Sequence, residues 1–173
     1  MSIKLLLSAL LMLIISSCSN KSGTSFYYEV KQLSFKFEPP YAGAETKFAE
    51  VVVNIDSACA ANKADTANLQ KVTLDKLVCV MDSGKNFDLF GGLTVELQSD
   101  NTTITTLTAA SVTEVTKGKQ EITFSGSEEK NVVAFLKEKK FNVLLSTNLN
   151  STDTAAYTIV ANLTFKITAH TKK

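Results

Sequence analysis

The sequence predicts an all-β fold, an antiparallel β-sandwich of about eight or nine short strands with one or two short helices. Two observations predict it. Segments in which apolar and polar residues alternate recur along the chain, and turn-forming residues separate them roughly every ten residues. The last segment, from Tyr157 to His170, alternates almost without a break. A period of two sustained over this length indicates a strand with one face in a core and the other in water.

The first half of the sandwich is predicted to contain three strands, at residues 26–37, 48–55 and 72–81. In the first strand Leu33, Phe35 and Phe37 alternate with polar residues. The two prolines that follow should end it, because proline cannot donate a hydrogen bond to a sheet ladder. Residues 56–69 are alanine-rich, which predicts a short helix or an ordered loop between the second and third strands.

The second half is predicted to contain strands at residues 93–98, 111–116, 120–125 and 141–146 before the final strand. Residues 127–137 are the best helix candidate, because their apolar residues recur at helical spacing. Glu128 and Glu129 stand at the start of this helix and lysines at its end, which complements the helix dipole. The two carboxylates therefore have a structural explanation. The whole domain, residues 26–173, fits an immunoglobulin-like or similar sandwich.

The residues that precede the sandwich have a different composition. Lys4 opens an apolar run that ends at Ile15 and is followed by small residues. This is the order of a signal peptide, and the run is shorter than the roughly 20 residues that a membrane-spanning helix needs. Residues 1–17 are therefore predicted to be a cleaved signal peptide. Residues 18–25, which are small and polar after the cysteine, are predicted to form a flexible tether.

The motif Ile15-Ser16-Ser17-Cys18 resembles the lipobox of bacterial lipoproteins, which has the order aliphatic, small, small, cysteine. This resemblance implies that the Cys18 thiol is lipidated, that the chain is cut before it, and that the new amine is acylated. Two or more acyl chains anchor a protein stably, whereas one holds weakly. The resemblance thus implies a membrane partner, reached through the N-terminal lipid, and a place in the bacterial cell envelope. An ordinary secretory signal that happens to contain a cysteine is the alternative.

Two further features refine the lipoprotein resemblance. Ser19 occupies the position where aspartate directs lipoproteins to the inner membrane, so the outer membrane is favoured, with its periplasmic or surface face left open. Residues 131–169 resemble the C-terminal part of small β-sandwich lipoproteins common in Bacteroidota, with a short helix, an alternating strand, a polar turn and a long strand. The second resemblance implies a fold and no activity, because function depends on a site.

Charge is nearly balanced, with 18 basic residues, all of them lysine, against 17 acidic residues. A neutral chain lacks the basic footprint of a nucleic-acid-binding protein, so no nucleic-acid partner is expected. Arginine and tryptophan are absent. The chain therefore lacks two of the residue types most enriched at binding hot spots, although codon bias in an AT-rich genome explains the missing arginine better than any function does.

If Cys18 carries lipid, Cys59 and Cys79 remain as an even pair in an oxidising compartment. A disulfide between them would close a loop of about twenty residues and stabilise the fold by about 3 kcal/mol. Two separate buried thiols are the alternative, since free cysteine packs as a small hydrophobe. A metal site that adds His170 lacks a ligand spacing, so no metal or other cofactor is expected.

No catalytic residue is predicted. His170, the single histidine, lies on the polar side of the last strand, and the chain has no nucleophile elbow, phosphate loop or zinc-protease motif. We therefore expect a non-enzymatic binding, adhesion or assembly module whose partner is an envelope protein or a glycan, with its ligand-binding residues unassigned. The alternative is a lipid-anchored carrier of lipid or glycan, or an enzyme, that uses a pocket of the sandwich.

Overall fold

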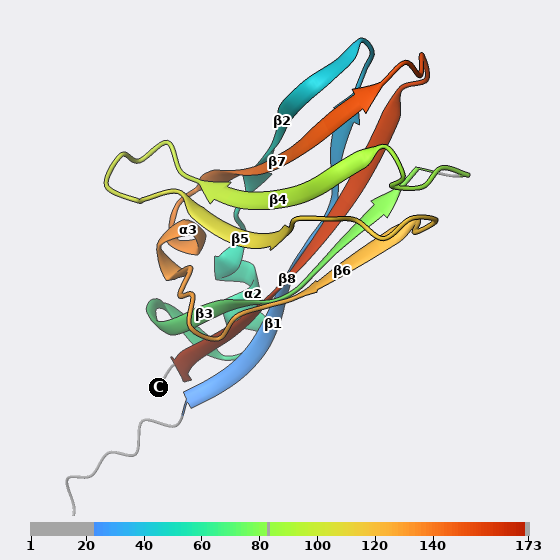
Figure 1. The fold of residues 1–173 in the computed structure, drawn as a ribbon. Helices are drawn as coiled ribbons and strands as arrows, with labels where there is room; N and C mark the ends of the chain where they lie inside the picture. The colour runs from blue at the N-terminus through green and yellow to red at the C-terminus, as the bar shows by residue number, and fades with distance from the viewer. Residues whose placement is uncertain (1–22, 83, 172–173) are drawn as a thin grey trace, which may run out of the picture.

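The computed structural model describes residues 23–82 and 84–171, which form a sandwich of two antiparallel four-stranded sheets (Figure 1). The β8 sheet has the strand order β1 (Gly23–Phe37), β8 (Tyr157–Thr171), β3 (Ala64–Met81) and β6 (Glu121–Ser125). The β7 sheet has the order β2 (Tyr41–Val52), β7 (Lys140–Ser151), β4 (Phe90–Gln98) and β5 (Leu107–Val112). The all-β class and the sandwich architecture are confirmed.

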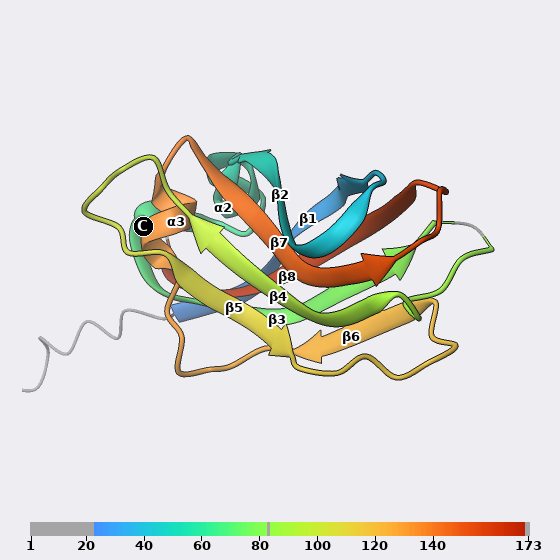
Figure 2. The same cartoon turned by 45° about the horizontal axis from the view of Figure 1, so that its top comes forward.

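The core lies between the inner faces of the two sheets, which Figure 2 shows stacked one above the other. The inward side chains of β8 between Ile159 and Ala169 are each between 0% and 1% exposed, and the outward residues between them are half-buried. The predicted alternation of the last strand is therefore confirmed. Inward residues of β4 and β7 face the inward side of β8 from the other sheet. They are buried as well, namely Leu93, Val95, Leu97, Phe141, Val143 and Leu145.

Two short helices, α2 (Ile55–Ala61) and α3 (Val133–Lys137), cover one end of the sandwich (Figure 2). Helix α2 buries Ile55 and Cys59, and α3 buries Phe135 and Leu136. A helix was expected within residues 56–69, and α2 fills only the first part of that range. Asn62 and Lys63 form a turn, and the residues from Ala64 onward belong to β3, which pairs with the end of β8.

The helix predicted over residues 127–137 is shorter than expected, since α3 begins only at Val133. Residues 126–132 instead run beside β3, where the amide of Gly126 donates to the carbonyl of Asp75 and the amide of Val132 donates to the carbonyl of Val72, both at 2.8 Å. A Cβ at Gly126 would lie 1.5 Å from the carbonyl oxygen of Leu74, so only glycine fits this crossing.

The helix-dipole explanation of Glu128 and Glu129 is consequently wrong. Both residues precede α3 in a turn, and no acidic residue lies in the first turn of that helix. Glu128 instead approaches the β8 sheet, where its Oε1 atom lies 3.6 Å from the Nζ atom of Lys166.

Several strands begin earlier than the alternation predicts. Gly23–Ser25 was assigned to the tether, yet these residues pair with the last residues of β8. Strand β2 begins at Tyr41, and β5 begins at Leu107 and ends at Val112. In each case a long neighbouring strand supplies ladder partners, so the backbone continues as a strand where the side chains show no apolar period.

Strand β2 lies at an edge of the β7 sheet. Glu45 and Lys47 lie on its inner side, opposite Thr147 and Leu145 of β7. Their side chains pair at 3.1 Å, and the Lys47 ammonium lies 5.7 Å from the centre of the Phe37 ring. Inward-pointing charges on an edge strand oppose pairing with the edge of another molecule, because pairing would bury them further.

Candidate ligand-binding surface

Cys18, the lipobox and the tether up to residue 22 lie outside the described residues, so the lipid anchor stays a prediction. Within residues 23–82 and 84–171, no helix combines the length and the apolar character needed to cross a bilayer. The described chain begins at Gly23, which pairs with His170 near the end of β8. Strands β1 and β8 therefore present their N-terminal and C-terminal ends side by side (Figure 1).

The disulfide expected between Cys59 and Cys79 is not formed, because both residues are buried free thiols. Cys59 lies in α2, and its thiol makes a hydrogen bond with Thr66 near the start of β3. Cys79 lies further along that strand: Leu69 pairs with Ala169 and Cys79 with Ala161, so about 26 Å of the ladder lies between them, whereas a disulfide needs Cα atoms within about 7 Å. The length of β3 thus separates the two residues, and burial raises the pKa of Cys79 to about 12.

His170 lies on the outward side of β8, as predicted, but it is not simply solvated. Its Nε2 atom lies 2.7 Å from the Nε2 atom of Gln70 on β3, within hydrogen-bond distance. Its Nδ1 atom is buried and has no hydrogen-bond partner among the described residues. No group of three His, Cys, Asp or Glu residues in the described part of the chain is placed to hold a metal ion.

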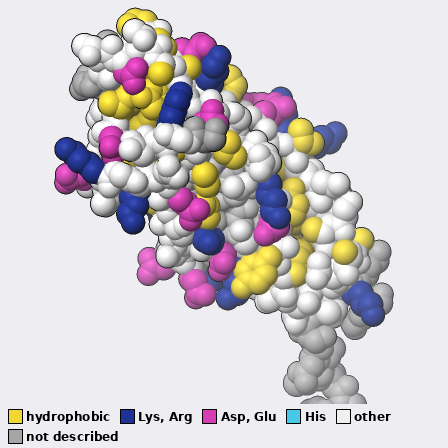
Figure 3. Space-filling view, turned by 90° about the vertical axis from the view of Figure 1, so that its right-hand side faces the viewer, with side chains coloured by type: hydrophobic (Ala, Val, Ile, Leu, Met, Phe, Trp, Pro, Cys, Tyr) yellow, Lys and Arg dark blue, Asp and Glu magenta, His cyan; other side chains and the backbone are white. Residues whose placement is uncertain are grey.

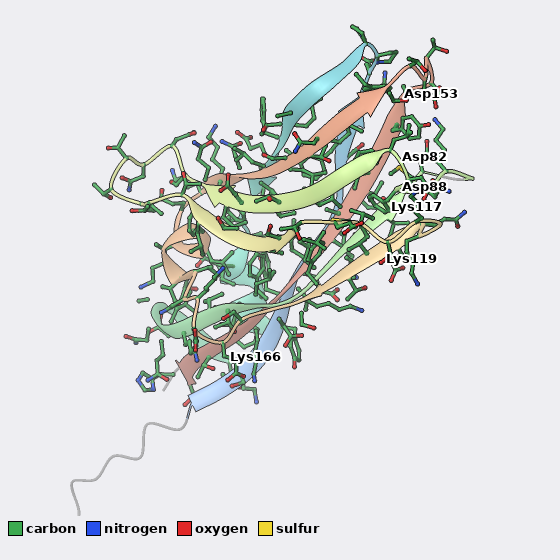
Figure 4. The ribbon with its side chains drawn as sticks, in the orientation of Figure 1. Asp82, Asp88, Lys117, Lys119, Asp153 and Lys166 are labelled. Carbon is green, nitrogen blue, oxygen red and sulfur yellow. The ribbon has the colours of Figure 1, made fainter. Side chains whose placement is uncertain are left out.

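Charged residues gather at the end of the sandwich opposite the helices, where Figure 4 labels Asp82, Asp88, Lys117, Lys119 and Asp153. The carboxylates at this end organise turns. The Oδ1 atom of Asp88 accepts a hydrogen bond from the amide of Gly118 at 2.5 Å. The carboxylate of Asp153 accepts from the Tyr157 hydroxyl and from the amide of Ala155.

The Asp153–Tyr157 hydrogen bond shifts the pKa values of the two side chains in opposite directions. It holds the pKa of Asp153 below its usual value, and the same bond, together with burial, raises the pKa of Tyr157 to about 12. A carboxylate that stays ionised and a phenol that stays protonated at neutral pH form a stable structural pair. They offer no group that would exchange a proton with a substrate near pH 7.

A candidate site is a polar hollow on the outer face of the β7 sheet, the face turned toward the viewer in Figure 1. Its volume is about 370 Å³. All four strands line it, and the outward-facing lining residues are small, comprising Ala44, Thr46, Gly92, Thr94, Ser111, Thr113, Ser146 and Asn148. None of these eight residues carries a charge.

Four hydroxyls cross the floor of the polar hollow in register. Thr46 of β2 pairs with Ser146 of β7, Ser146 pairs with Thr94 of β4, and Thr94 pairs with Ser111 of β5. We call these four residues the hydroxyl row. Its side-chain oxygens are hydrogen-bonded in two pairs, Thr46 with Ser146 at 2.8 Å and Thr94 with Ser111 at 3.2 Å.

The polar hollow arises from side-chain size and from one close backbone approach. A Cβ at Gly92 would lie 2.8 Å from the carbonyl oxygens of Val112 and Thr113, so glycine lets β4 and the end of β5 come together. The next outward row across the sheet is taller, and it consists of Phe48, Leu144, Glu96 and Thr108. This taller row lies next to the hydroxyl row, at the side of the polar hollow, and does not itself line the hollow.

The sequence did not predict the polar hollow, although the four residues of the hydroxyl row each lie on the outer side of a strand. The hydroxyl row exists only because the four strands pair in one register, and register cannot be read from the period of a single strand. The one available signal is the accumulation of small side chains on the polar side of these strands, and it gives no position by itself.

Charges elsewhere on the molecule are mixed. Figure 3, which views the molecule from the right-hand side of Figure 1, shows lysine and acidic side chains interspersed with hydrophobic and uncharged ones. This face offers no continuous basic surface of the kind that binds nucleic acid.

No family model matches the chain, and no curated protein matches it. A solved structure of Desmodium yellow mottle tymovirus aligns with 88% of this chain and 85% of its own, at 14% sequence identity and a TM-score of 0.31. A solved structure of turnip yellow mosaic virus aligns with 84% of this chain and 94% of its own, at 15% identity and a TM-score of 0.31. TM-scores this low support no inference about this chain.

Proposed function

We propose that this chain is a lipid-anchored, non-enzymatic binding module of the bacterial cell envelope that uses the outer face of its β7 sheet. The observation that carries the binding role is the polar hollow, a depression of about 370 Å³ that is lined from four strands and whose eight outward residues are uncharged. Ligand sites are concave and have a small number of placed polar groups, and the polar hollow meets both conditions. The lipobox supports the anchor at Cys18.

A carrier or an enzyme that works inside the sandwich receives less support. The space between the sheets is filled by large apolar side chains, and Phe35, Phe37, Phe141 and Phe165 are each at most 1% exposed. An interior ligand would have to displace this packing, which is costly because protein cores are close-packed. We therefore place ligand binding on the surface, with an envelope protein or a glycan as the partner.

The proposed location is the outer membrane, on the basis of Ser19 after the lipidated cysteine. Residues 19–22, which lie between Cys18 and β1, span about 14 Å at most when extended. The sandwich is thus proposed to stay close to the bilayer, so its partner should be another component at or near that membrane.

The anchor is tested by growing cells with an alkyne-bearing fatty acid and measuring its incorporation into the protein. Wild type and the Cys59→Ala control should carry the label and sediment with the membranes. Cys18→Ala should carry no label and should appear in the soluble fraction. An unlabelled Cys18→Ala protein that still sediments with the membranes would show that lipid at this residue is not the anchor.

The binding role is tested with a photo-cross-linking amino acid placed in living cells at Thr113, in the polar hollow. The matched control carries it at Thr164, on the outer face of β8. An adduct formed from Thr113 and not from Thr164 supports the proposal. Equal adducts at both positions, or none at either, would remove the polar hollow as the binding site.

A further inference from the structure

An exposed aromatic ring stands beside the polar hollow. Phe48 is 73% exposed, although most large apolar side chains of this chain are buried. It follows Thr46 by two residues on β2, so both side chains point outward and lie about 7 Å apart along the strand. Leu144 lies opposite Phe48 on β7, so an apolar side chain neighbours the ring on the same outer face. An exposed apolar ring therefore lies next to the polar floor of the hollow.

The floor both donates and accepts hydrogen bonds. Each hydroxyl of the row can donate one hydrogen and accept two. When two hydroxyls bond to each other, as Thr46 does with Ser146, one O–H and several lone pairs remain for a ligand. The amide of Asn148 adds both a donor and an acceptor. A ligand that satisfies this floor must itself carry groups that donate and accept, which is the property of a polyol.

The lining also selects against charge. The eight outward residues of the polar hollow carry none, and the charged residue that also lines it, Glu45, is anionic and pairs with Lys47 at 3.1 Å on the inner side of β2. No cation faces the hollow from this set to neutralise a phosphate or a sulfate. An anionic ligand would lose its water without gaining a counter-charge, which is unfavourable.

From these observations we infer that the polar hollow binds a neutral glycan, with one sugar ring stacked on Phe48 and the adjoining hydroxyls bonded to the hydroxyl row. This inference rests on the proposed binding role of the same surface. A sugar ring has an apolar C–H face and a rim of hydroxyls, and it thus matches a flat aromatic side chain beside a hydroxyl-lined floor. The 370 Å³ volume lies at the small end of the range for ligand sites, so the glycan contributes only a short segment of its chain.

The inference is tested by calorimetric titration of the full chain, purified in a polyoxyethylene detergent so that no sugar headgroup competes. The probes are neutral hexasaccharides of glucose, xylose and N-acetylglucosamine, with hexagalacturonate as the acidic counterpart. We expect at least one neutral hexasaccharide to bind and the acidic one not to bind. Phe48→Ala should weaken binding about tenfold, the equivalent of one stacked aromatic contact, and Thr94→Trp should abolish it by filling the polar hollow.

Matched controls come from the opposite sheet. Tyr27→Ala removes an aromatic ring that is 59% exposed, and Thr164→Trp adds a ring at a half-buried outward threonine of β8. Both should bind the glycan as wild type does. Thermal unfolding of each variant establishes that it is folded, and Phe48→Ser serves as a second variant for the ring.

Three results would overturn the inference: no binding of any neutral hexasaccharide, binding of the acidic one only, or binding that Phe48→Ala and Thr94→Trp leave unchanged. The cross-linking experiment separates this failure from failure of the proposed function. An adduct from Thr113 to a protein, without glycan binding, would keep the binding module and reject the glycan. No adduct and no glycan binding would reject both.

Discussion

Strands β8 and β2 have similar lengths but occupy opposite kinds of position. β8 is a central strand, paired with β1 on one side and β3 on the other, and its inward residues from Ile159 to Ala169 are at most 1% exposed. β2 is an edge strand, paired only with β7 within its sheet, and it exposes Phe48 and Val52 by 73% and 74%. The comparison teaches that burial dictates the side chains of the central strand, whereas the edge strand leaves room for residues that serve a partner.

The largest expected effect is on the free energy of unfolding. It should distinguish the two strands when one phenylalanine in each is replaced by alanine. Phe165→Ala in β8 should lower the free energy of unfolding by about 3–5 kcal/mol, because it leaves a cavity in a filled core. Phe48→Ala in β2 should change it by less than about 0.5 kcal/mol, because the ring is already in water. Urea unfolding followed by circular dichroism measures both. Similar losses for the two variants would mean that β2 is covered in the protein as it exists in solution.

A smaller effect is expected from the tyrosines that begin the two strands. Tyr157 of β8 donates to Asp153, and its pKa is raised to about 12 from 10.0, so its contribution to stability is complete below about pH 10. That contribution should be lost as pH rises from 10 through 12, because the phenolate cannot donate. Tyr41 of β2 donates to the carbonyls of Phe37 and Ala155, and burial raises its pKa as well.

Unfolding midpoints measured from pH 8 to 11.5 test this pair. Tyr157→Phe should be less stable than wild type at pH 8 and should lose less stability on going to pH 11.5. Tyr41→Phe should retain the alkaline loss that Tyr157 causes. An alkaline loss that is the same in wild type and in Tyr157→Phe would show that the Tyr157 hydroxyl does not contribute to it.

The smallest expected effect on stability is that of a reducing agent, which should cause no change. Cys79 lies in β3 beside β8 and Cys59 lies in α2, and the two thiols are not bonded. Dithiothreitol should therefore leave the urea midpoint unchanged, whereas loss of a disulfide would cost about 3 kcal/mol. In the absence of reductant, iodoacetamide at pH 8 should spare Cys79 in the folded chain, since its pKa of about 12 keeps the thiol protonated, and it should label both thiols in urea. Thiols that resist labelling in urea until reductant is added would indicate a disulfide.

Much of the fold could be predicted from sequence because burial on one face imposes a period of two. The inward residues of β8 and those within residues 93–98 of β4 and 141–146 of β7 were identified this way, and Phe37 was correctly placed before a proline stop. Strand ends were predicted less well. Gly23–Ser25 and the start of β2 pair through their backbones, and that pairing leaves no mark on the side-chain pattern.

The site could not be predicted, for a related reason. Thr46, Thr94, Ser111 and Ser146 are distant in sequence and become neighbours only through the registers of three strand pairs. The separation of Cys59 from Cys79 likewise depends on the length of β3, which the alanine-rich start of the strand concealed. Both outcomes are set by tertiary pairing and not by local composition.

The pairing of Gly23 with His170 has a mechanical consequence. A pull on the chain before Gly23, directed along the axis of β1, would act parallel to the β1–β8 ladder. The thirteen pairs between Gly23 and Phe37 would then be loaded together in shear, and not opened one after another as in a zipper. A sandwich held at that end while its β7 sheet binds a partner would resist such tension with all thirteen pairs of the β1–β8 ladder at once.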